Sequence, residues 1–333
     1  MPVLTVSNLY KRFNLEAGFF ARFGRFVNAV NDISYSIGKN EAYGLVGESG
    51  CGKTTTARML VRMYEADTGK IIFNQDDSAL NVSGLKKEEL RQYREKVRYV
   101  FQDPAKSLNP RMNVYEVLVS GCRKPLRKKG ISENELREKA AAILEEVGLQ
   151  SADLEKRPSE FSGGQRQRIS IARALLMEGE ILICDEVVSA LDVSIQGQIL
   201  NLLLDIRKKR NISFLFIAHD LKVACYFCDR IGVMYKGELM EEAPAENLYR
   251  EGLHPYTKLL FSSAAGNSQE PLAETQKRKE REEVNGDHCS FAPRCPNVTE
   301  RCLREHPELK EISPNHLIRC FNYAAADISS DNS

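Results

Sequence analysis

The residues best suited to chemistry include a glycine-rich segment near the start of the chain. Gly47-Glu48-Ser49-Gly50-Cys51-Gly52-Lys53-Thr54 fits the phosphate-binding pattern G-x-x-x-x-G-K-[ST], and Thr55 follows it. Its glycines let backbone N–H groups approach phosphate oxygens without a Cβ in the way. Lys53 brings a positive charge to the outer phosphates, and the Thr54 hydroxyl suits Mg²⁺. The segment predicts a site for a nucleoside triphosphate, in which Cys51 is a small, tolerated residue without a catalytic role.

A second glycine-rich segment, Phe161-Ser162-Gly163-Gly164-Gln165, lies far from the first and opens a predicted helix. Ser162 can cap that helix, while Gly163 and Gly164 leave backbone N–H groups bare for an anion. The segment predicts a second phosphate-binding element.

These residues must be positioned by the strands and helices around them. Apolar runs predict strands at residues 42–46, 97–101, 181–184 and 213–218, and helical patterns cover 54–64, 132–147 and 195–209. The first strand runs into the phosphate loop, the third ends at Asp185 and Glu186, and the fourth ends at His219. Strands alternating with helices predict a largely parallel sheet covered on both faces. Residues 3–7 alternate like an edge strand.

The two glycine-rich segments together resemble the ATP-binding cassette (ABC) ATPases, whose signature is L-S-G-G-Q; Phe161 stands in for the Leu. The resemblance implies an α/β P-loop NTPase fold, with a RecA-like core, an antiparallel β subdomain and a helical subdomain at about residues 103–175. It implies a cassette at 1–252 and a C-terminal extension at 253–333.

The same resemblance implies roles for single residues. Asp185 would hold Mg²⁺ with Thr54, and Glu186 would be the general base for the attacking water. His219 is similar to the switch histidine that contacts the γ-phosphate. Gln102 is similar to the glutamine of the Q-loop, which touches the metal or the water.

The resemblance also implies residues that contact adenine and residues that contact ATP bound to a second subunit. Phe13 is similar to the aromatic residue that stacks on adenine, and Asp192 to the aspartate of the D-loop. In the family, the signature contacts ATP held by a second subunit. Each ATP is then sandwiched between one chain's phosphate loop and the other chain's signature, here Ser162, Gly163, Gly164 and Gln165.

A narrower resemblance is to the F-type cassettes of oligopeptide and dipeptide importers. It is carried by FQDP at 101–104 running on to SLNPRM at 107–112, by SALDVSIQ at 189–196 and by LHPYT at 253–257. One departure is Val187, where the family usually has Pro.

This narrower resemblance implies an ATPase that powers peptide uptake from the cytoplasmic face of the membrane. Its implied partners are a D-type cassette, two permeases and, indirectly, an extracytoplasmic substrate-binding protein. Relatives transport nickel, glutathione or short sugars, so each of these remains an alternative substrate. A non-transport ABC ATPase remains an alternative function.

Four of the nine cysteines gather near the C-terminus: Cys289, Cys295, Cys302 and Cys320. In a cytosolic chain such a cluster indicates a metal site before disulfides. Four thiolates suit zinc or an iron–sulfur cluster. Zinc ribbons usually show C-x2-C knuckles, which these four cysteines lack, so their spacing favours the cluster. The motif Cys289-x5-Cys295-Pro296 is similar to the tail of peptide-importer cassettes, which implies a [4Fe-4S] cluster in a small metal-binding lobe, with zinc as the alternative.

Composition limits the remaining possibilities. The chain has 333 residues, enough for about two domains, and a formal net charge of +1, which does not favour nucleic acid as a partner. No run approaches the roughly 20 apolar residues of a membrane span, and the first residues lack the pattern of a signal peptide. The Phe-rich stretch at 19–26 is interpreted as an insertion folded on its own cassette, or else as an amphipathic membrane-surface element.

Overall fold

The computed structural model describes residues 2–14, 26–75, 78–264 and 288–323. Residues 19–25 of the Phe-rich stretch lie outside the described residues, so neither interpretation of that stretch is tested. Residues 276–283 (QKRKEREE), nearly all of them charged, also lie outside the described residues. The strands are β1 (Pro2–Asn14), β2 (Phe26–Gly38), β3 (Ala42–Val46), β4 (Thr68–Gln75), β5 (Ser78–Asn81), β6 (Val97–Val100), β7 (Ile181–Asp185), β8 (Ser213–Ala218), β9 (Arg230–Tyr235), β10 (Glu238–Pro244), β11 (Lys310–Ser313) and β12 (His316–Ile318).

The described strands form two sheets. The smaller sheet is antiparallel, in the order β2-β1-β4-β5, and the larger has the order β11-β12-β10-β9-β3-β8-β7-β6. Within the larger sheet β9, β3, β8, β7 and β6 run parallel, as the alternation of strands and helices predicts. The prediction of an edge strand at residues 3–7 is wrong, because β1 pairs with both β2 and β4. Alternation of apolar and polar residues shows that one face of a strand is exposed to solvent, but it does not show whether the strand has a hydrogen-bonded neighbour on each side.

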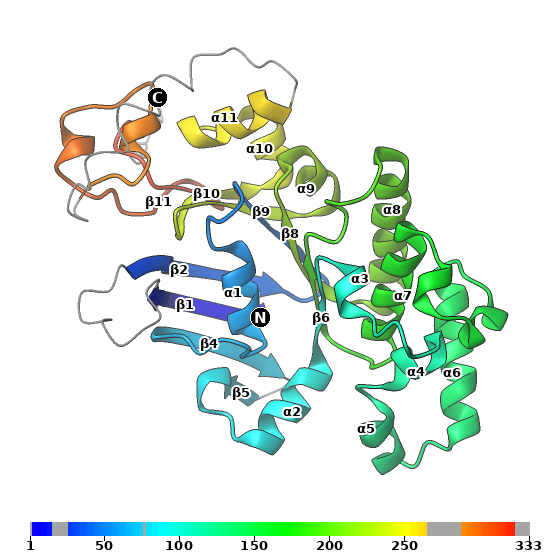
Figure 1. The fold of residues 1–333 in the computed structure, drawn as a ribbon. Helices are drawn as coiled ribbons and strands as arrows, with labels where there is room; N and C mark the ends of the chain where they lie inside the picture. Colours follow the sequence, from blue (N-terminus) through cyan, green and yellow to red (C-terminus); the bar gives the residue numbers. More distant parts are fainter. Residues whose placement is uncertain (1, 15–25, 76–77, 265–287, 324–333) are drawn as a thin grey trace, which may run out of the picture.

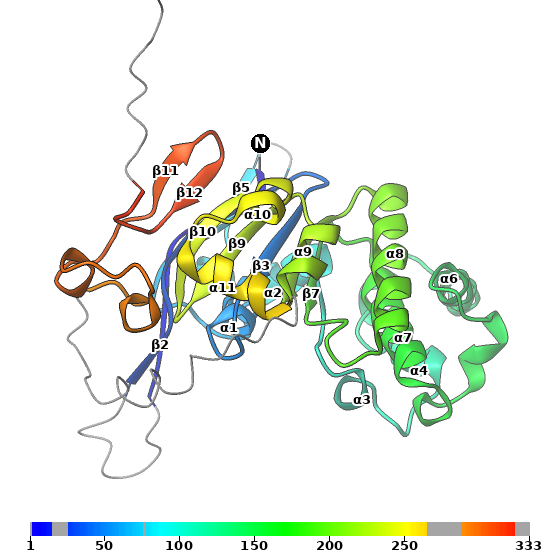
Figure 2. The same ribbon diagram turned by 90° about the horizontal axis from the view of Figure 1, so that it is seen from above.

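Helices cover the parallel sheet and form a separate group at one end of the molecule (Figures 1 and 2). In both views α4, α6, α7 and α8 stand together at that end. The α-helices are α1 (Lys53–Leu60), α2 (Lys87–Lys96), α3 (Pro104–Ser107), α4 (Val114–Val119), α5 (Arg123–Lys128), α6 (Glu133–Glu146), α7 (Gly163–Leu175), α8 (Val193–Arg210), α9 (Leu221–Phe227), α10 (Ala245–Glu251) and α11 (Pro255–Ala264).

The central strands feed two cores because successive side chains point to opposite faces. In β8, Phe214 and Phe216 pack into the core on the side of α7 and α8. Leu215 and Ile217 pack into the core shared with α1 and the antiparallel sheet. Both faces of this strand are therefore dry, which holds the strand end before His219 in place.

The last described part of the chain, residues 288–323, is called the C-terminal lobe below. It holds two short 3-10 helices, Ala292–Arg294 and Arg301–Leu303, and strands β11 and β12. Strand β12 pairs with β10, with Glu241 opposite Ile318. The lobe therefore extends the sheet that carries the phosphate loop (Figure 2).

Candidate functional site

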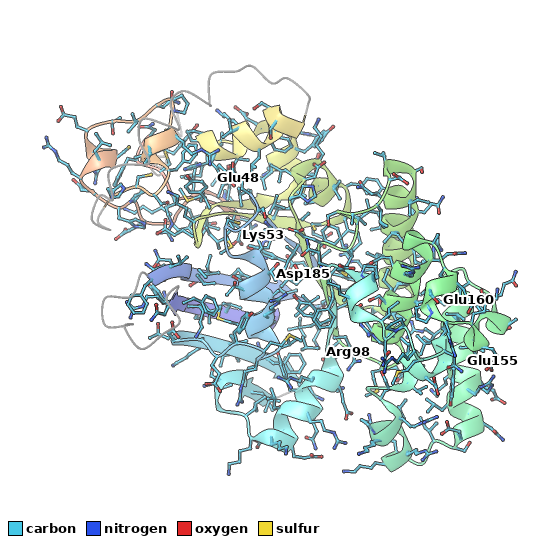
Figure 3. The ribbon with its side chains drawn as sticks, in the orientation of Figure 1. Glu48, Lys53, Arg98, Glu155, Glu160 and Asp185 are labelled. Atoms are coloured by element: carbon cyan, nitrogen blue, oxygen red, sulfur yellow. The ribbon has the colours of Figure 1, made fainter. Side chains whose placement is uncertain are left out.

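The parallel register brings the predicted site residues to one edge of the sheet. Val46 lies opposite Ala218, Cys184 opposite Val100, and Asp185 opposite Ile217. The segments that follow these strand ends carry the phosphate loop, Glu186, His219 and Gln102. Figure 3 shows Glu48, Lys53 and Asp185 near one another at the centre of the molecule, between the antiparallel sheet and the helices.

The phosphate loop packs tightly against the β9–β10 hairpin and β2. A Cβ on Gly47 would lie 2.1 Å from the Met234 carbonyl oxygen, and one on Gly52 would lie 2.0 Å from that of Ala29. Gly52 also has φ of 111°, a left-handed conformation in which a side chain is strained. Both positions therefore require glycine.

The other loop residues divide into exposed and buried ones. Ser49 and Gly50 are exposed, and Thr55 is half-buried in the first turn of α1. Cys51 is buried, and burial raises the pKa of its thiol. Its carbonyl accepts a hydrogen bond from Gly237 N–H at 2.9 Å, which ties the loop to the hairpin. The thiol is thus a packing group.

Lys53 and Glu186 belong to one chain of contacts. The buried Lys53 ammonium donates to the carbonyls of Gly47 at 2.8 Å and Glu48 at 2.9 Å, and lies 3.8 Å from Glu186 Oε1. Gln102 Nε2 donates to Glu186 Oε2 at 2.6 Å. The phosphate loop, the end of β7 and the segment after β6 therefore meet at the Glu186 carboxylate.

Thr54 and Asp185 belong to a second chain of contacts. The Thr54 hydroxyl donates to Asp185 Oδ1 at 2.9 Å, and the Tyr99 hydroxyl donates to Asp185 Oδ2 at 2.6 Å. Burial, followed by the charge of Asp185, raises the pKa of Tyr99. The sequence interpretation missed Tyr99, since a tyrosine in a short strand carries no motif of its own.

The turn after β7 holds Glu186 in an unusual conformation. Its φ is 47°, uncommon for a residue with a side chain, and its N–H donates to the Ile217 carbonyl at 3.1 Å. Val187, where the family usually has Pro, is buried. Glu186 and the exposed His219 line the same small cavity.

The signature segment caps α7 as predicted. Ser162 Oγ accepts from Gln165 N–H at 3.3 Å, and Gln165 Oε1 accepts from Ser162 N–H at 2.9 Å. Gly163 lines a groove with Gln102 and Leu191, beside the exposed Asp192. A Cβ on Gly164 would lie 2.7 Å from Ile195, whereas one on Gly163 meets only Leu191 at 3.9 Å.

Phe13 lies in β1 and packs edge-to-face on Tyr64, with ring centroids 5.3 Å apart. Tyr64 follows the C-terminal end of α1, whereas the phosphate loop precedes the N-terminal end of that helix. Adenine stacking on Phe13 stays a prediction.

The four C-terminal cysteines all lie in the lobe as free thiols. Cys289 N–H donates to the Cys302 carbonyl at 3.0 Å. Burial raises the pKa of Cys289 to about 11 and that of Cys295 and Cys320, and the charges of neighbouring thiols raise them further. Across the described ranges, lobe included, no three His, Cys, Asp or Glu side chains are grouped to hold a metal ion. The predicted cluster therefore has no support from this arrangement.

The sequence analysis assigned no role to a group of buried carboxylates on β10. Glu238 accepts from Ser290 Oγ and contacts His306 Nε2, and Glu241 lies 2.7 Å from His316 Nε2. Charged residues within an otherwise apolar strand were the signal for such partners.

The comparisons with known proteins agree with this geometry. A family profile described as "ABC transporter" matches residues 30–189, and one described as "Oligopeptide/dipeptide transporter, C-terminal region" matches residues 240–302. Among solved structures, CbiO1 from Clostridium perfringens superposes with a TM-score of 0.63 at 25% identity over 75% of this chain and 91% of its own. The dimeric cassette MJ0796 bound to ADP and Pi gives 0.61 at 25% identity over 73% and 98%.

Two curated relatives from Bacillus subtilis (strain 168) are closer in sequence. The oligopeptide transport ATP-binding protein OppF is 43% identical over 88% of this chain and 90% of its own length. The corresponding protein AppF is 40% identical over 97% and 98%. Among the described helices, none has the length and apolar character to cross a membrane. The chain belongs to the ATP-binding subunits of oligopeptide ABC transporters, the ATPases that power peptide transport.

Proposed function

We propose that this chain hydrolyses ATP at the carboxyl edge of its parallel sheet and so drives peptide import through partner permeases. The observation that carries the proposal is the contact of Lys53 and Gln102 with the single carboxylate of Glu186. This contact joins the residue that would bind the outer phosphates to the residue that would activate water.

The phosphates of ATP would lie over the N-terminal end of α1, in the loop from Gly47 to Thr54. Lys53 would leave its carbonyl partners for the outer phosphates. Thr54 and Asp185, whose oxygens are 2.9 Å apart, provide the ligand type that Mg²⁺ prefers. The metal, when bound, would neutralise charge that develops on the phosphates.

Glu186 is our candidate for the general base. It stands at the end of a buried strand, where backbone contacts fix its reach and orientation. The amide of Gln102 holds one of its oxygens, and His219 faces the same cavity. We assign Gln102 to placing the attacking water and His219 to the γ-phosphate.

A second cassette would complete the site. The bare N–H groups of Gly163 and Gly164, with Ser162, Gln165 and Asp192, would face ATP bound to a D-type partner. The similar cassette MJ0796, which is dimeric in its ADP- and Pi-bound structure, supports this pairing. Two permeases and an external binding protein would complete a transporter with this chain at the cytoplasmic face.

Transport by the assembled complex tests this function. The chain, co-purified with its permeases and partner cassette, is placed in proteoliposomes with ATP enclosed, and the substrate-binding protein and a labelled tripeptide are added outside. We expect peptide accumulation that stops when Lys53 is replaced by Ala. Accumulation of nickel or glutathione without peptide would contradict peptide import.

The cysteines of the C-terminal lobe require a separate test. We propose that Cys289, Cys295, Cys302 and Cys320 ligate a [4Fe-4S] cluster; the proposal rests on their motif in the sequence and on their place in one small lobe, and requires the thiols to move closer together than they lie in the described residues. Anaerobically purified protein should absorb at about 400 nm and lose this band in Cys302→Ser but not in Cys225→Ser. One zinc and no iron by elemental analysis would contradict the cluster.

A further inference from the structure

An arginine of the C-terminal lobe reaches the phosphate loop. Arg294 Nη1 donates to Glu48 Oε2 at 2.8 Å, and Nη2 donates to Glu48 Oε1 at 2.7 Å. Glu48 is the second residue of the phosphate loop, and 246 positions separate the two residues. Paired, parallel hydrogen bonds of this kind are the strongest and most directional form of an ion pair.

The guanidinium is held in place by aromatic rings. Its centre lies 5.5 Å from the ring centroid of Tyr235 and 5.9 Å from that of Phe291. The rings of Tyr235, Phe291 and Tyr256 are mutually in contact, with centroids 4.8 to 5.4 Å apart, and all three are buried. Arg294 therefore rests on a platform built from β9, α11 and the lobe.

Glu48 connects this platform to Lys53. Its N–H donates to the Tyr256 hydroxyl at 2.9 Å, its carbonyl accepts from Lys53 Nζ at 2.9 Å, and its carboxylate holds Arg294. A displacement of Glu48 would therefore displace the carbonyl that orients the lysine. The Glu48 side chain is 42% exposed, so an unpaired carboxylate there would place an uncompensated negative charge on the phosphate loop itself.

We propose that the C-terminal lobe contributes Arg294 to the nucleotide site as a positioning residue, which neutralises Glu48 and lets the phosphate loop accept ATP. A polyphosphate is repelled by a bare carboxylate and not by a carboxylate in a bidentate ion pair. The inference rests on the assignment of the phosphate loop proposed above. It gives the lobe a direct role in nucleotide affinity, apart from any metal that its cysteines hold.

The test separates neutralisation from general stability. ATP binding to the full chain is measured by titration with a fluorescent ATP analogue, and KM and kcat are measured in the assembled transporter. Arg294→Met should raise the Kd and KM for ATP roughly three- to tenfold, with kcat within about twofold of wild type. The effect should be smaller at high salt, which screens the exposed carboxylate.

Removing the carboxylate should restore affinity. In the double variant Glu48→Gln with Arg294→Met, the Kd should return to within about twofold of Glu48→Gln alone. Arg304→Met is the matched control, because Arg304 lies in the same lobe and pairs only weakly, 3.5 Å from Glu300, on an exposed surface. It should leave the Kd unchanged.

Two outcomes would overturn the inference: an unchanged Kd in Arg294→Met, or a double variant that binds as weakly as Arg294→Met. The melting temperature of each variant shows whether a loss of affinity comes from unfolding of the lobe. Arg294→Lys, which keeps the positive charge, should retain most of the affinity for ATP even if Arg294→Met is unstable. ATP binding that survives Lys53→Ala would instead remove the phosphate loop from the site, and the inference with it.

Discussion

Two groups of carboxylates lie on the same sheet and differ in what surrounds them. Asp185 and Glu186, at the end of β7, contact hydroxyl, amide and ammonium groups that would also serve a nucleotide. On β10, Glu241 accepts from Leu253 N–H at 2.9 Å and His254 N–H at 3.0 Å, besides its contact with His316. Glu242 pairs with Arg230 and accepts from the Tyr43 hydroxyl at 2.9 Å.

The difference lies in the partners. The β10 carboxylates are buried and are held by groups that belong to the fold, including the C-terminal lobe. Glu186 stands at an open edge, beside an exposed histidine, in a strained turn. For Glu186, strain at an open strand end is typical of a functional carboxylate. Burial and pairing alone do not separate the two groups, because Asp185 is also buried and paired, but its partner Thr54 belongs to the phosphate loop, whereas the β10 partners belong to the fold.

The sharpest test of this comparison is Glu186→Gln. Without the base, turnover in the assembled transporter should fall about 10²- to 10⁴-fold, while ATP binding persists, because the phosphate loop is untouched. The variant should also accumulate as an ATP-bound dimer, measured by size-exclusion chromatography. Glu180→Gln, at a half-buried ion pair with Lys96, is the control and should keep its turnover. Turnover near wild type in Glu186→Gln would remove this residue from the role of base.

For the β10 carboxylates we expect a loss of stability rather than a loss of turnover. Glu241→Ala leaves the buried His316 and two backbone N–H groups without their acceptor, and should lower the free energy of unfolding by about 3 kcal/mol. Urea unfolding measures this loss. At temperatures where the variant is folded, the kcat of the transporter should remain near wild type, and a specific loss of kcat with unchanged stability would break the comparison.

A carboxylate added to the signature segment should affect assembly without affecting folding. A Cβ at Gly163 meets only Leu191 at 3.9 Å, and Gly163→Asp would place a negative charge at the signature, where the partner's ATP is expected. Hydrolysis in the pair should fall about 10- to 100-fold, while ATP still binds to this chain's own phosphate loop. Weakened binding at the chain's own loop, measured by nucleotide titration, would contradict the sandwich arrangement.

The smallest expected effect concerns His254, next to Glu241. Burial lowers the pKa of this histidine to about 4, and its Nδ1 accepts from Tyr256 N–H at 3.0 Å. In the unfolded chain His254 is protonated near its ordinary pKa of about 6.5, whereas in the folded chain it stays neutral until the pH approaches 4. The free energy of unfolding therefore falls as the pH drops from about 6.5 towards 4.

Between pH 7.5 and 5.5 this histidine should cost about 1 kcal/mol of unfolding free energy. His254→Asn, which keeps an acceptor, should reduce that pH dependence in urea unfolding measured at both pH values. An identical pH dependence in the variant and wild type would mean that His254 is not the titrating group.

Much of the ATPase site follows from sequence alone, because its motifs are local. A phosphate loop needs its glycines, lysine and threonine within one turn, and parallel strands bring their carboxyl ends to one edge whatever the details of packing. Gly47 to Thr54, the Ser162 cap and the strand ending at Asp185 could therefore be placed from short runs of residues. The signature segment, found in the same chain as the phosphate loop, also indicated the family.

Tertiary structure decided what depends on contacts between distant segments. Tyr99 beside Asp185, Arg294 on Glu48, and the lobe residues paired with β10 carry no local pattern. The interior place of β1 depends on strand pairing, which alternation does not report. Cysteine spacing likewise indicates potential ligands, but whether four thiols converge on one ion depends on the path of the chain between them.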